Sequence, residues 1–369
     1  MKNGFILKKL LVNIGILFVV ITLNFFLPRL IYSDPATPYY AGVPEDAVAL
    51  RQAIREEYGF DKPMFVQYLV YLGKLLRLDF GTSYIYKEPV FDVMFKRIPW
   101  SLVLSLSTLV ISVTLGIIFG AVAAKNRGKW QDSIILRLST LSTAIPTFWL
   151  AMVSVMLFAF TIPVFPYRGA MTEGYTLVMN KPLFAGVFFG SVLLTVILYL
   201  IFRKGFLTFT VPLVGLAAAI GVSIPFDDIA DIAYHAFLPV VITAIGSTIS
   251  YALLVRNSMI SVVNEDYILT ARAKGVPARK ILFGHTFRNA LLPLVTSIGL
   301  GISGLIGGSV LMEQIFTWPG MGNLLLEANN NGDFQLAQAI LLLFAIITIA
   351  ANFITDLIYH KLDPRVGIV

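Results

Sequence analysis

The sequence has no cysteine, only three histidines and few charged residues. The lack of cysteine excludes disulfide bonds, thiolate zinc sites, iron–sulfur clusters and a cysteine nucleophile. With only His235, His285 and His360, an all-histidine metal site would need residues from three distant segments. Charged residues make up 13% of the 369 residues and hydrophobic residues 57%, whereas a soluble domain has roughly 25% and about 45–50%. This composition argues against a soluble globule, a disordered chain or a fibre.

Long apolar runs take up much of the chain. A helix that crosses a bilayer needs about 20 mainly apolar residues, because hydrocarbon offers its backbone no hydrogen-bonding partner. Eight segments meet this requirement, at residues 10–28, 101–124, 135–163, 184–202, 206–224, 237–256, 290–312 and 337–359. The first run is longer than the roughly 7–15 residues of a signal-peptide core and no cleavage pattern follows it, so we expect it to remain as a span. The sequence therefore predicts an all-α, polytopic membrane protein with about eight spans.

The charges between these segments predict the orientation. Basic residues gather in alternate connections, which hold Lys2, Lys8 and Lys9; Lys125, Arg127 and Lys129; Arg203 and Lys204; the stretch 256–288; and Lys361 and Arg365. The short connections 225–236 and 313–335 contain no lysine or arginine. The positive-inside rule then places both termini in the cytoplasm. The net charge of +7 is interpreted as an orientation signal, and no nucleic-acid partner is expected.

One pair of spans looks like an insertion, and the long outer loop contains predicted helices. Segments 184–202 and 206–224 form a separable hairpin, and its removal leaves six spans in unchanged orientation, so we interpret it as an insertion. The long outer loop 29–100 has helical spacing of apolar residues at 45–58 and 63–78. The second of these helices is aromatic-rich and amphipathic, and it either lies on the bilayer surface or packs against the spans.

The inner connection 257–289 has the most informative pattern. Asp266 suits the N-terminus of a short helix, where a carboxylate complements the helix dipole. The small side chains of this helix allow another backbone to approach it closely. Gly275 can adopt the left-handed conformation that ends a helix. Pro277 suits the first turn of a second helix, which runs to about Asn289. Two short helices joined by Gly-Val-Pro predict a compact docking element.

Not every charge in this region needs a special role. Six basic residues against two acids give 256–288 a local charge of +4 (6 − 2). For Arg256 and Arg279, enforcing membrane orientation is a sufficient explanation.

Several motifs resemble one family of membrane proteins. Asp266 to Gly275 (DYILTARAKG) and His285 to Pro293 (HTFRNALLP) resemble the EAA-type cytoplasmic loop of bacterial ATP-binding-cassette (ABC) importer permeases, most closely the B-type permease of the dipeptide/oligopeptide/nickel group. Leu269 replaces a glutamate of the general motif, and Phe287-Arg288 stands where the general motif has Leu-Pro, which is similar to the peptide-permease variant. Matching strings also occur in order at 34–36, 60–68, 79–83, 145–149, 316–322 and 362–365, so the resemblance covers nearly the whole chain except about 166–231.

The resemblance implies a fold and a division of the chain. The fold is the six-helix core of an ABC type I importer with an extra transmembrane hairpin. Residues 1–28 are then the first span, 29–100 a long external loop, and 101–369 the permease domain, with the hairpin at about 184–224 and the coupling loop at 257–289. The chain lies in the bacterial inner membrane.

The resemblance also implies partners and contact residues. A coupling helix in this family sits in a groove of a cytoplasmic ATPase, and the corresponding residues here are Asp266, Thr270, Ala271, Arg272, Ala273, Lys274, Gly275, His285, Arg288 and Asn289, with Arg272 and Lys274 as polar anchors. A phosphate-binding Gly-x4-Gly-Lys-Ser/Thr string is absent, since Gly128-Lys129 is followed by Trp130. The chain therefore binds no cofactor and is not an enzyme, and ATP and Mg²⁺ belong to partner subunits. The expected partners are two ABC ATPases, a second homologous permease, a solute-binding protein and the lipid bilayer.

Two further regions are expected to be structured. Residues 313–333 combine a Pro-Gly turn with polar residues and form an ordered external element near the pore mouth, marked by Glu313, Trp318, Pro319, Gly320, Gly322 and Asp333. This element either contacts the binding protein or braces the spans. Span 290–312 is rich in small residues, and Gly301, Gly304 and Gly308 suit close helix packing or a pore or subunit interface.

Two other functions match parts of the sequence. Ser303 lies in a Gly-x-Ser-Gly string typical of serine hydrolases, but it is mid-membrane, and His285 and His360 lie towards the inner side. An ion-coupled secondary transporter is the more serious alternative, although such carriers place ionisable residues deep in their spans and these spans are almost free of charge. The resemblance implies peptides as cargo, while relatives carry nickel, glutathione-like compounds or oligosaccharides.

Overall fold

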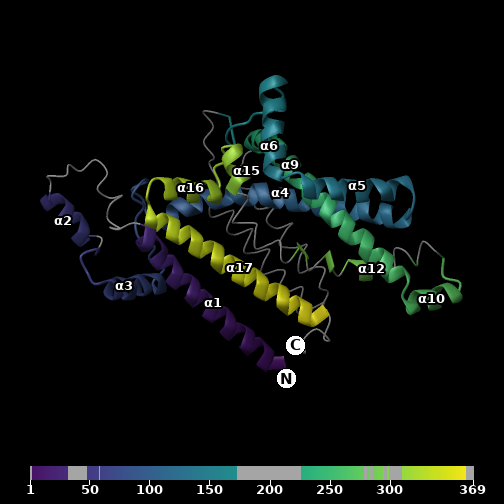
Figure 1. Ribbon diagram of the computed structural model, residues 1–369, viewed down its shortest axis with the longest axis horizontal. Helices are drawn as coiled ribbons and strands as arrows, with labels where there is room; N and C mark the ends of the chain where they lie inside the picture. The colour runs from purple at the N-terminus through teal and green to yellow at the C-terminus, as the bar shows by residue number, and fades with distance from the viewer. Residues whose placement is uncertain are drawn as a thin grey trace. The chain divides into compact units, whose positions relative to one another are not determined.

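The computed structural model describes residues 2–31, 48–57, 59–172, 226–277, 281, 286–291, 293–294, 297–298 and 310–362. The described residues are predominantly helical (Figure 1), which confirms the predicted all-α class. They divide into two compact units, Met1–Val153 with Val240–Val369, and Ser154–Pro239. The elements are α1 (Lys2–Ile31), α2 (Val48–Glu57), α3 (Met64–Leu76), α4 (Val90–Lys125), α5 (Trp130–Ala144), α6 (Thr147–Val155), η2 (Met156–Thr161), α9 (Phe226–Val263), α10 (Asp266–Ala273), α12 (Phe287–Ala290), α15 (Val310–Ile315), α16 (Met321–Asn330) and α17 (Phe334–Leu362).

Four of the described helices are long and apolar enough to cross a membrane. Their apolar parts are Lys8–Phe26, Val90–Lys125, Asp227–Val263 and Phe334–Phe353. These helices coincide with the predicted spans 10–28, 101–124, 237–256 and 337–359. The predicted spans 184–202 and 206–224 lie outside the described residues, as does most of 290–312, including Gly301, Gly304 and Gly308.

The predicted span 135–163 is not one straight helix. It consists of Trp130–Ala144 and Thr147–Thr161, which are bent by 88° relative to each other. The break lies at Ile145-Pro146, where Ile145 is extended (φ −105°, ψ 115°). A residue before proline is driven out of the helical region by the proline ring, which explains why α5 ends here. Pro146 directly precedes α6, and its carbonyl accepts the first helical hydrogen bond, from the amide of Leu150 at 3.2 Å.

The structure lengthens the helix that follows the outer loop. α4 begins at Val90, so that 90–100, expected to belong to the outer loop, is helical. Asp92, Lys96 and Arg97 make this stretch too polar to be recognised as part of a span. Val90, Val93 and Met94 nevertheless form a buried face against α16 and α17. Burial of this one face stabilises the polar first turns.

Glycine brings α4 and α9 close together. A Cβ atom at Gly120 would lie 2.6 Å from the carbonyl oxygen of Ala252, and one at Gly116 would lie 2.5 Å from Cβ of Tyr251. Neither approach is possible with a side chain at these positions. Small residues allow such helix pairs to pack closely where both are apolar.

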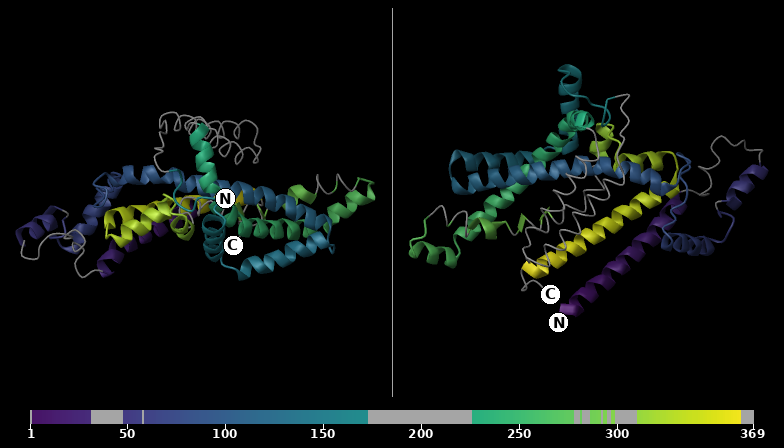
Figure 2. Two further views of the ribbon diagram at one scale, coloured as in Figure 1. Left: turned by 90° about the horizontal axis from the view of Figure 1, so that it is seen from above. Right: turned by 180° about the vertical axis from the view of Figure 1, so that it is seen from behind.

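The two ends of the chain form a second helix pair. α1 and α17 run side by side in Figure 1 and in the right-hand view of Figure 2. Asn24 Nδ2 donates to the carbonyl of Gln338 at 2.7 Å, and Gln338 Nε2 donates to the carbonyl of Asn24 at 2.8 Å. This reciprocal pair satisfies two buried amides and fixes the register of the two helices.

The outer-loop helices predicted at 45–58 and 63–78 are confirmed as α2 and α3. α3 packs on the end of α1, because Tyr68 lies 5.1 Å from Phe25 between ring centroids and its hydroxyl is 2.7 Å from Thr22 Oγ1. Of the two expectations for this helix, packing against a span is therefore observed. In the second unit, Asp231 accepts two hydrogen bonds from Thr172, and Phe165 stacks on Phe237.

Candidate functional site

The predicted coupling helix is α10, which follows α9 after only Asn264 and Glu265. Glu265 is the extended N-cap residue, and Asp266 stands in the first turn. There the carboxylate faces the positive end of the helix dipole. The helix begins where the sequence predicts it.

The end of α10 is a Schellman motif. Gly275 has φ +74°, the left-handed conformation that favours glycine. Its amide donates to the carbonyl of Arg272 at 2.9 Å, and the amide of Val276 donates to the carbonyl of Ala271 at 3.2 Å. Two carbonyl groups that would otherwise lack a partner at the helix end are thereby satisfied. The predicted left-handed stop at Gly275 is confirmed.

Ile268 is the one buried residue of α10, and the other residues of the helix are exposed or half-buried. Ile268 is completely buried, whereas Tyr267 is 42% and Leu269 52% exposed. The predicted contact residues Asp266, Thr270, Arg272, Ala273, Lys274 and Gly275 are also exposed, and Ala271 is half-buried. A helix held by one buried side chain with small and charged residues on its surface is a suitable docking element.

The second half of the loop is described only in part. The amide of Ile281 donates to the carbonyl of Pro277 at 3.0 Å, which is a helical hydrogen bond. Arg288 and Asn289 belong to α12, and His285 lies outside the described residues. Ala290 and Leu294, which follow, pack with Val255 and Met259 of α9. The loop therefore leaves α9 and returns to it.

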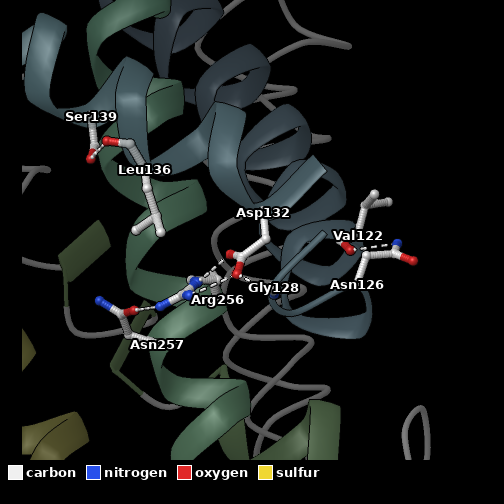
Figure 3. A network of polar contacts seen from close by, with 8 residues as sticks. All are labelled: Val122, Asn126, Gly128, Asp132, Leu136, Ser139, Arg256 and Asn257. Carbon is white, nitrogen blue, oxygen red and sulfur yellow. Dashed lines mark hydrogen bonds and ion pairs between the residues drawn. The ribbon is translucent and has the colours of Figure 1, made fainter. Parts of the chain in front are cut away.

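A charged pair that the sequence did not predict lies between α5 and α9 (Figure 3). Arg256 Nε donates to Asp132 Oδ1 at 2.7 Å and Arg256 Nη2 donates to Asp132 Oδ2 at 3.0 Å. The exposed fractions of the side chains are 15% for Arg256 and 4% for Asp132. Parallel hydrogen bonds between a guanidinium and a carboxylate are the strong, directional form of an ion pair. Orientation alone is therefore not a sufficient explanation for Arg256.

Glu313 is the centre of the element predicted at 313–333. Its side chain is completely buried. Ser101 Oγ of α4 donates to Oε1 at 2.7 Å, and the amide of Asn323 donates to Oε2 at 2.9 Å. Burial raises the pKa of Glu313 above its ordinary value. Ser101 also accepts the amide of Met321 at 2.7 Å, so one carboxyl group and one hydroxyl fix α16 to α4.

The other predicted residues of this element support the same turn. Trp318 is completely buried, and its Nε1 donates to the carbonyl of Trp100 at 2.9 Å. Gly320 is buried beside the Glu313 carboxylate, where a Cβ atom would overlap the carboxyl group. At Gly322 a Cβ atom would lie 2.9 Å from Cα of Val310. Pro319, which lies between Trp318 and Gly320 in the chain, is half-buried.

Asp333 connects the start of α17 to the loop before α4. It accepts hydrogen bonds from Ser83 Oγ at 2.5 Å, from the amide of Ile85 at 3.2 Å and from the amide of Leu336 at 3.1 Å. The last of these caps α17. Glu313, Trp318 and Asp333 are buried within the chain, and their hydrogen bonds join this element to α4 and to the loop before α4.

In the described ranges, no group of three or more histidine, aspartate or glutamate side chains could hold a metal ion.

Comparison with known proteins identifies relatives over the whole chain. Residues 116–368 match the family described as "Binding-protein-dependent transport system inner membrane component", and residues 2–106 match the family described as "Binding-prot-dependent transport system membrane comp, N-term". The chain is 31% identical over 364 residues to the oligopeptide transport system permease protein AppB of Bacillus subtilis (strain 168), covering 98% of this chain and 99% of the relative. It is 31% identical to the di/tripeptide transport system permease protein DppB of Pseudomonas aeruginosa (strain UCBPP-PA14), covering 98% of each. The glutathione transport system permease protein GsiC of Salmonella choleraesuis (strain SC-B67) is 29% identical over 98% of each chain.

Proposed function

The chain belongs to the family of binding-protein-dependent transport system inner membrane components, and we propose that it forms half of the path by which an ABC importer carries peptides into a bacterial cell. Membership makes it a membrane permease subunit of a peptide-type transport system. The proposal goes beyond family membership in four respects: the partners of the chain, its contact with the ATPases, its orientation and its cargo. Each rests on separate features of the chain.

The single observation that carries the coupling role is that α10 is exposed and that a Schellman motif fixes its C-terminal end. A helix transmits force only if it does not unwind at its end, and the Schellman motif at Gly275 satisfies that condition. Arg272 and Lys274 are exposed on it and available to a partner. We assign Asp266 to Gly275 to the groove of a cytoplasmic ATPase, with His285, Arg288 and Asn289 on the returning limb.

The partners follow from the same assignment. A family that depends on a binding protein requires an extracytoplasmic solute-binding subunit. The sequence contains no phosphate-binding loop, so ATP and Mg²⁺ belong to two partner ATPases. A core of six spans is half of such a pore, and a second homologous permease completes it. The chain itself is non-catalytic in this assignment.

The proposed orientation places both termini in the cytoplasm of the bacterial inner membrane. The connection between α4 and α5 holds Lys125, Arg127 and Lys129, which is the basic bias of a cytoplasmic connection. The external element Glu313–Asp333 then lies at the opposite side. We retain the division into a first span at 1–28, an external loop at 29–100 and a permease domain at 101–369, with a hairpin at about 184–224 and a coupling loop at 257–289.

Peptides are the proposed cargo because AppB and DppB are named for oligopeptide and di/tripeptide transport. GsiC is named for glutathione, which is itself a small peptide. Uptake of a radiolabelled tripeptide by cells that carry the complete system tests the proposal. Uptake should persist when proton and sodium gradients are collapsed and should stop when ATP is depleted. The reverse pattern would identify an ion-coupled carrier instead.

A further inference from the structure

Arg256 lies close to the point where α9 continues into the coupling helix. Val263 ends α9, and Asn264 and Glu265 connect it to α10. Arg256 lies seven positions before Val263, which is about 10 Å along a helix. A movement of α10 therefore reaches Arg256 through two turns of helix. Whatever holds Arg256 determines which other parts of the chain follow that movement.

Asp132 holds Arg256 from the first turn of α5. Figure 3 shows the guanidinium of Arg256 directed at the carboxylate of Asp132, with Asn257 Oδ1 accepting Arg256 Nη1 at 2.9 Å on its other side. Asp132 Oδ2 also accepts the amide of Gly128 at 2.9 Å, in the turn between α4 and α5. Gly128 has φ +80°, so this turn is fixed by a left-handed residue and by the carboxylate together. One side chain thus joins α9, α5 and the α4–α5 turn.

Stability alone does not explain a buried ion pair between apolar helices. Removing both charges from water costs about as much as their attraction returns. α4 and α9 are already held by close packing at Gly116 and Gly120. The ion pair adds a directional contact between α9 and α5.

We propose that the Asp132–Arg256 pair is a clamp that makes the α4–α5 turn move with the coupling helix as one body. The two side chains are positioning residues, because they act on the transport path through the helices and not by contact with cargo or nucleotide. This inference rests on the proposed coupling role of α10. Without the clamp, α9 would slide along α5, and part of each ATP-driven movement would be lost.

The test uses the assembled transporter in liposomes, with the second permease, both ATPases and the binding protein. The tripeptide transported per ATP hydrolysed should fall several-fold in Asp132→Asn and Arg256→Gln and should recover in the exchanged variant Asp132→Arg/Arg256→Asp. Arg256→Lys keeps the charge but cannot form both parallel bonds. It should assemble like the parent and still transport less per ATP. Glu88→Gln is the matched control, since the Glu88–Lys96 pair is exposed and should contribute little.

A distance measurement gives a second readout that does not depend on the cargo. The chain has no cysteine, so Lys129→Cys and Ser261→Cys provide two unique and exposed sites for spin labels. With the pair intact, the label distance should be the same with and without a non-hydrolysable ATP analogue. In Asp132→Asn it should change when the analogue binds.

The outcomes separate the clamp from the proposed function. If the parent shows no ATP-driven uptake, the proposed function fails. If the parent is active and Arg256→Lys transports normally, or if the label distance in Asp132→Asn stays constant, the clamp fails while the proposed function stands. Loss of assembly in Asp132→Asn and Arg256→Gln with full transport by Arg256→Lys would show a purely structural pair and would also overturn the clamp.

Discussion

At the scale of single residues, the element Glu313–Asp333 depends on one buried carboxyl group. Glu313 joins α15 to Ser101 of α4 and to the start of α16 through the amide of Asn323. The sequence placed Glu313, Trp318 and Gly320 in one element because Pro-Gly demands a turn. It could not reveal that Glu313 points inward, because its partner Ser101 is 212 positions away in the chain.

Glu313→Ala should destabilise the protein strongly. The substitution leaves the amide of Asn323 and the hydroxyl of Ser101 without an acceptor. The Ser101 hydroxyl is buried, and a buried polar group without a partner costs about 1–3 kcal/mol. Thermal unfolding of the purified protein in detergent measures the effect. Glu88→Ala is the control, because it removes a carboxylate from an exposed pair. Equal melting temperatures for the two variants would contradict the central role of Glu313.

Glu313 should also make stability depend on pH. Burial raises its pKa in the folded protein, so the folded state holds a proton that the unfolded state releases near its ordinary pKa of about 4.3. The stabilisation is therefore complete below the unfolded pKa and is lost as the pH rises through the folded pKa. Melting temperatures across the acid-to-neutral range should decline less for Glu313→Gln than for the parent. The same decline in both proteins would exclude Glu313 as its source.

At the scale of elements, α10 is the part best predicted from the sequence and the α5–α9 contact the worst. Asp266 and Gly275 mark the beginning and the end of α10 with local signals that need no tertiary contact. The Asp132–Arg256 pair joins residues 124 positions apart, so its parts look like unrelated charges at helix ends. The bend at Ile145-Pro146 has a local cause, but proline permits a bend without fixing its angle.

Gly275→Pro should uncouple transport from ATP hydrolysis without preventing insertion into the membrane. Proline requires φ near −65° and cannot adopt the +74° of Gly275, so the Schellman motif is lost and α10 frays. Ala271→Glu should act similarly by placing a charge where α10 meets its partner. Measuring tripeptide uptake and ATP hydrolysis in the assembled system provides the check.

Gly59→Pro is the matched control for this variant. Gly59 has φ +71° and, like Gly275, open space where a Cβ would be, but it lies in the loop between α2 and α3. The Gly59→Pro variant should lose order in this loop and should still couple transport to ATP hydrolysis. Normal uptake per ATP in Gly275→Pro would show that α10 does not transmit the movement.

At the scale of the whole molecule, hydropathy located four of the predicted spans in the described part of the chain, but it located their ends less well. The apolar parts of α1, α4, α9 and α17 coincide with predicted spans. α4 begins at Val90 in polar sequence because tertiary packing buries one face of its first turns. Hydropathy averages over a window and cannot detect a helix that is apolar on one face only.

The proposed topology predicts which positions face the outside of an intact cell. Asp61 and Lys129 are both exposed, and the first lies before α3 while the second lies between α4 and α5. A membrane-impermeant maleimide should label Asp61→Cys in intact cells and should label Lys129→Cys only after permeabilisation. The absence of native cysteine leaves no background. Labelling of Lys129→Cys in intact cells would invert the orientation and remove α10 from the cytoplasm.

The central claim is that α10 receives movement from an ATPase that this chain lacks. Reconstitution into liposomes tests it most directly, comparing the chain and its partner permease with and without the two ATPases, in the presence of binding protein and a labelled tripeptide. Uptake should occur only with ATP and the ATPases, and with no ion gradient imposed. Uptake by the permeases alone, with no nucleotide-hydrolysing subunit present, would contradict the account.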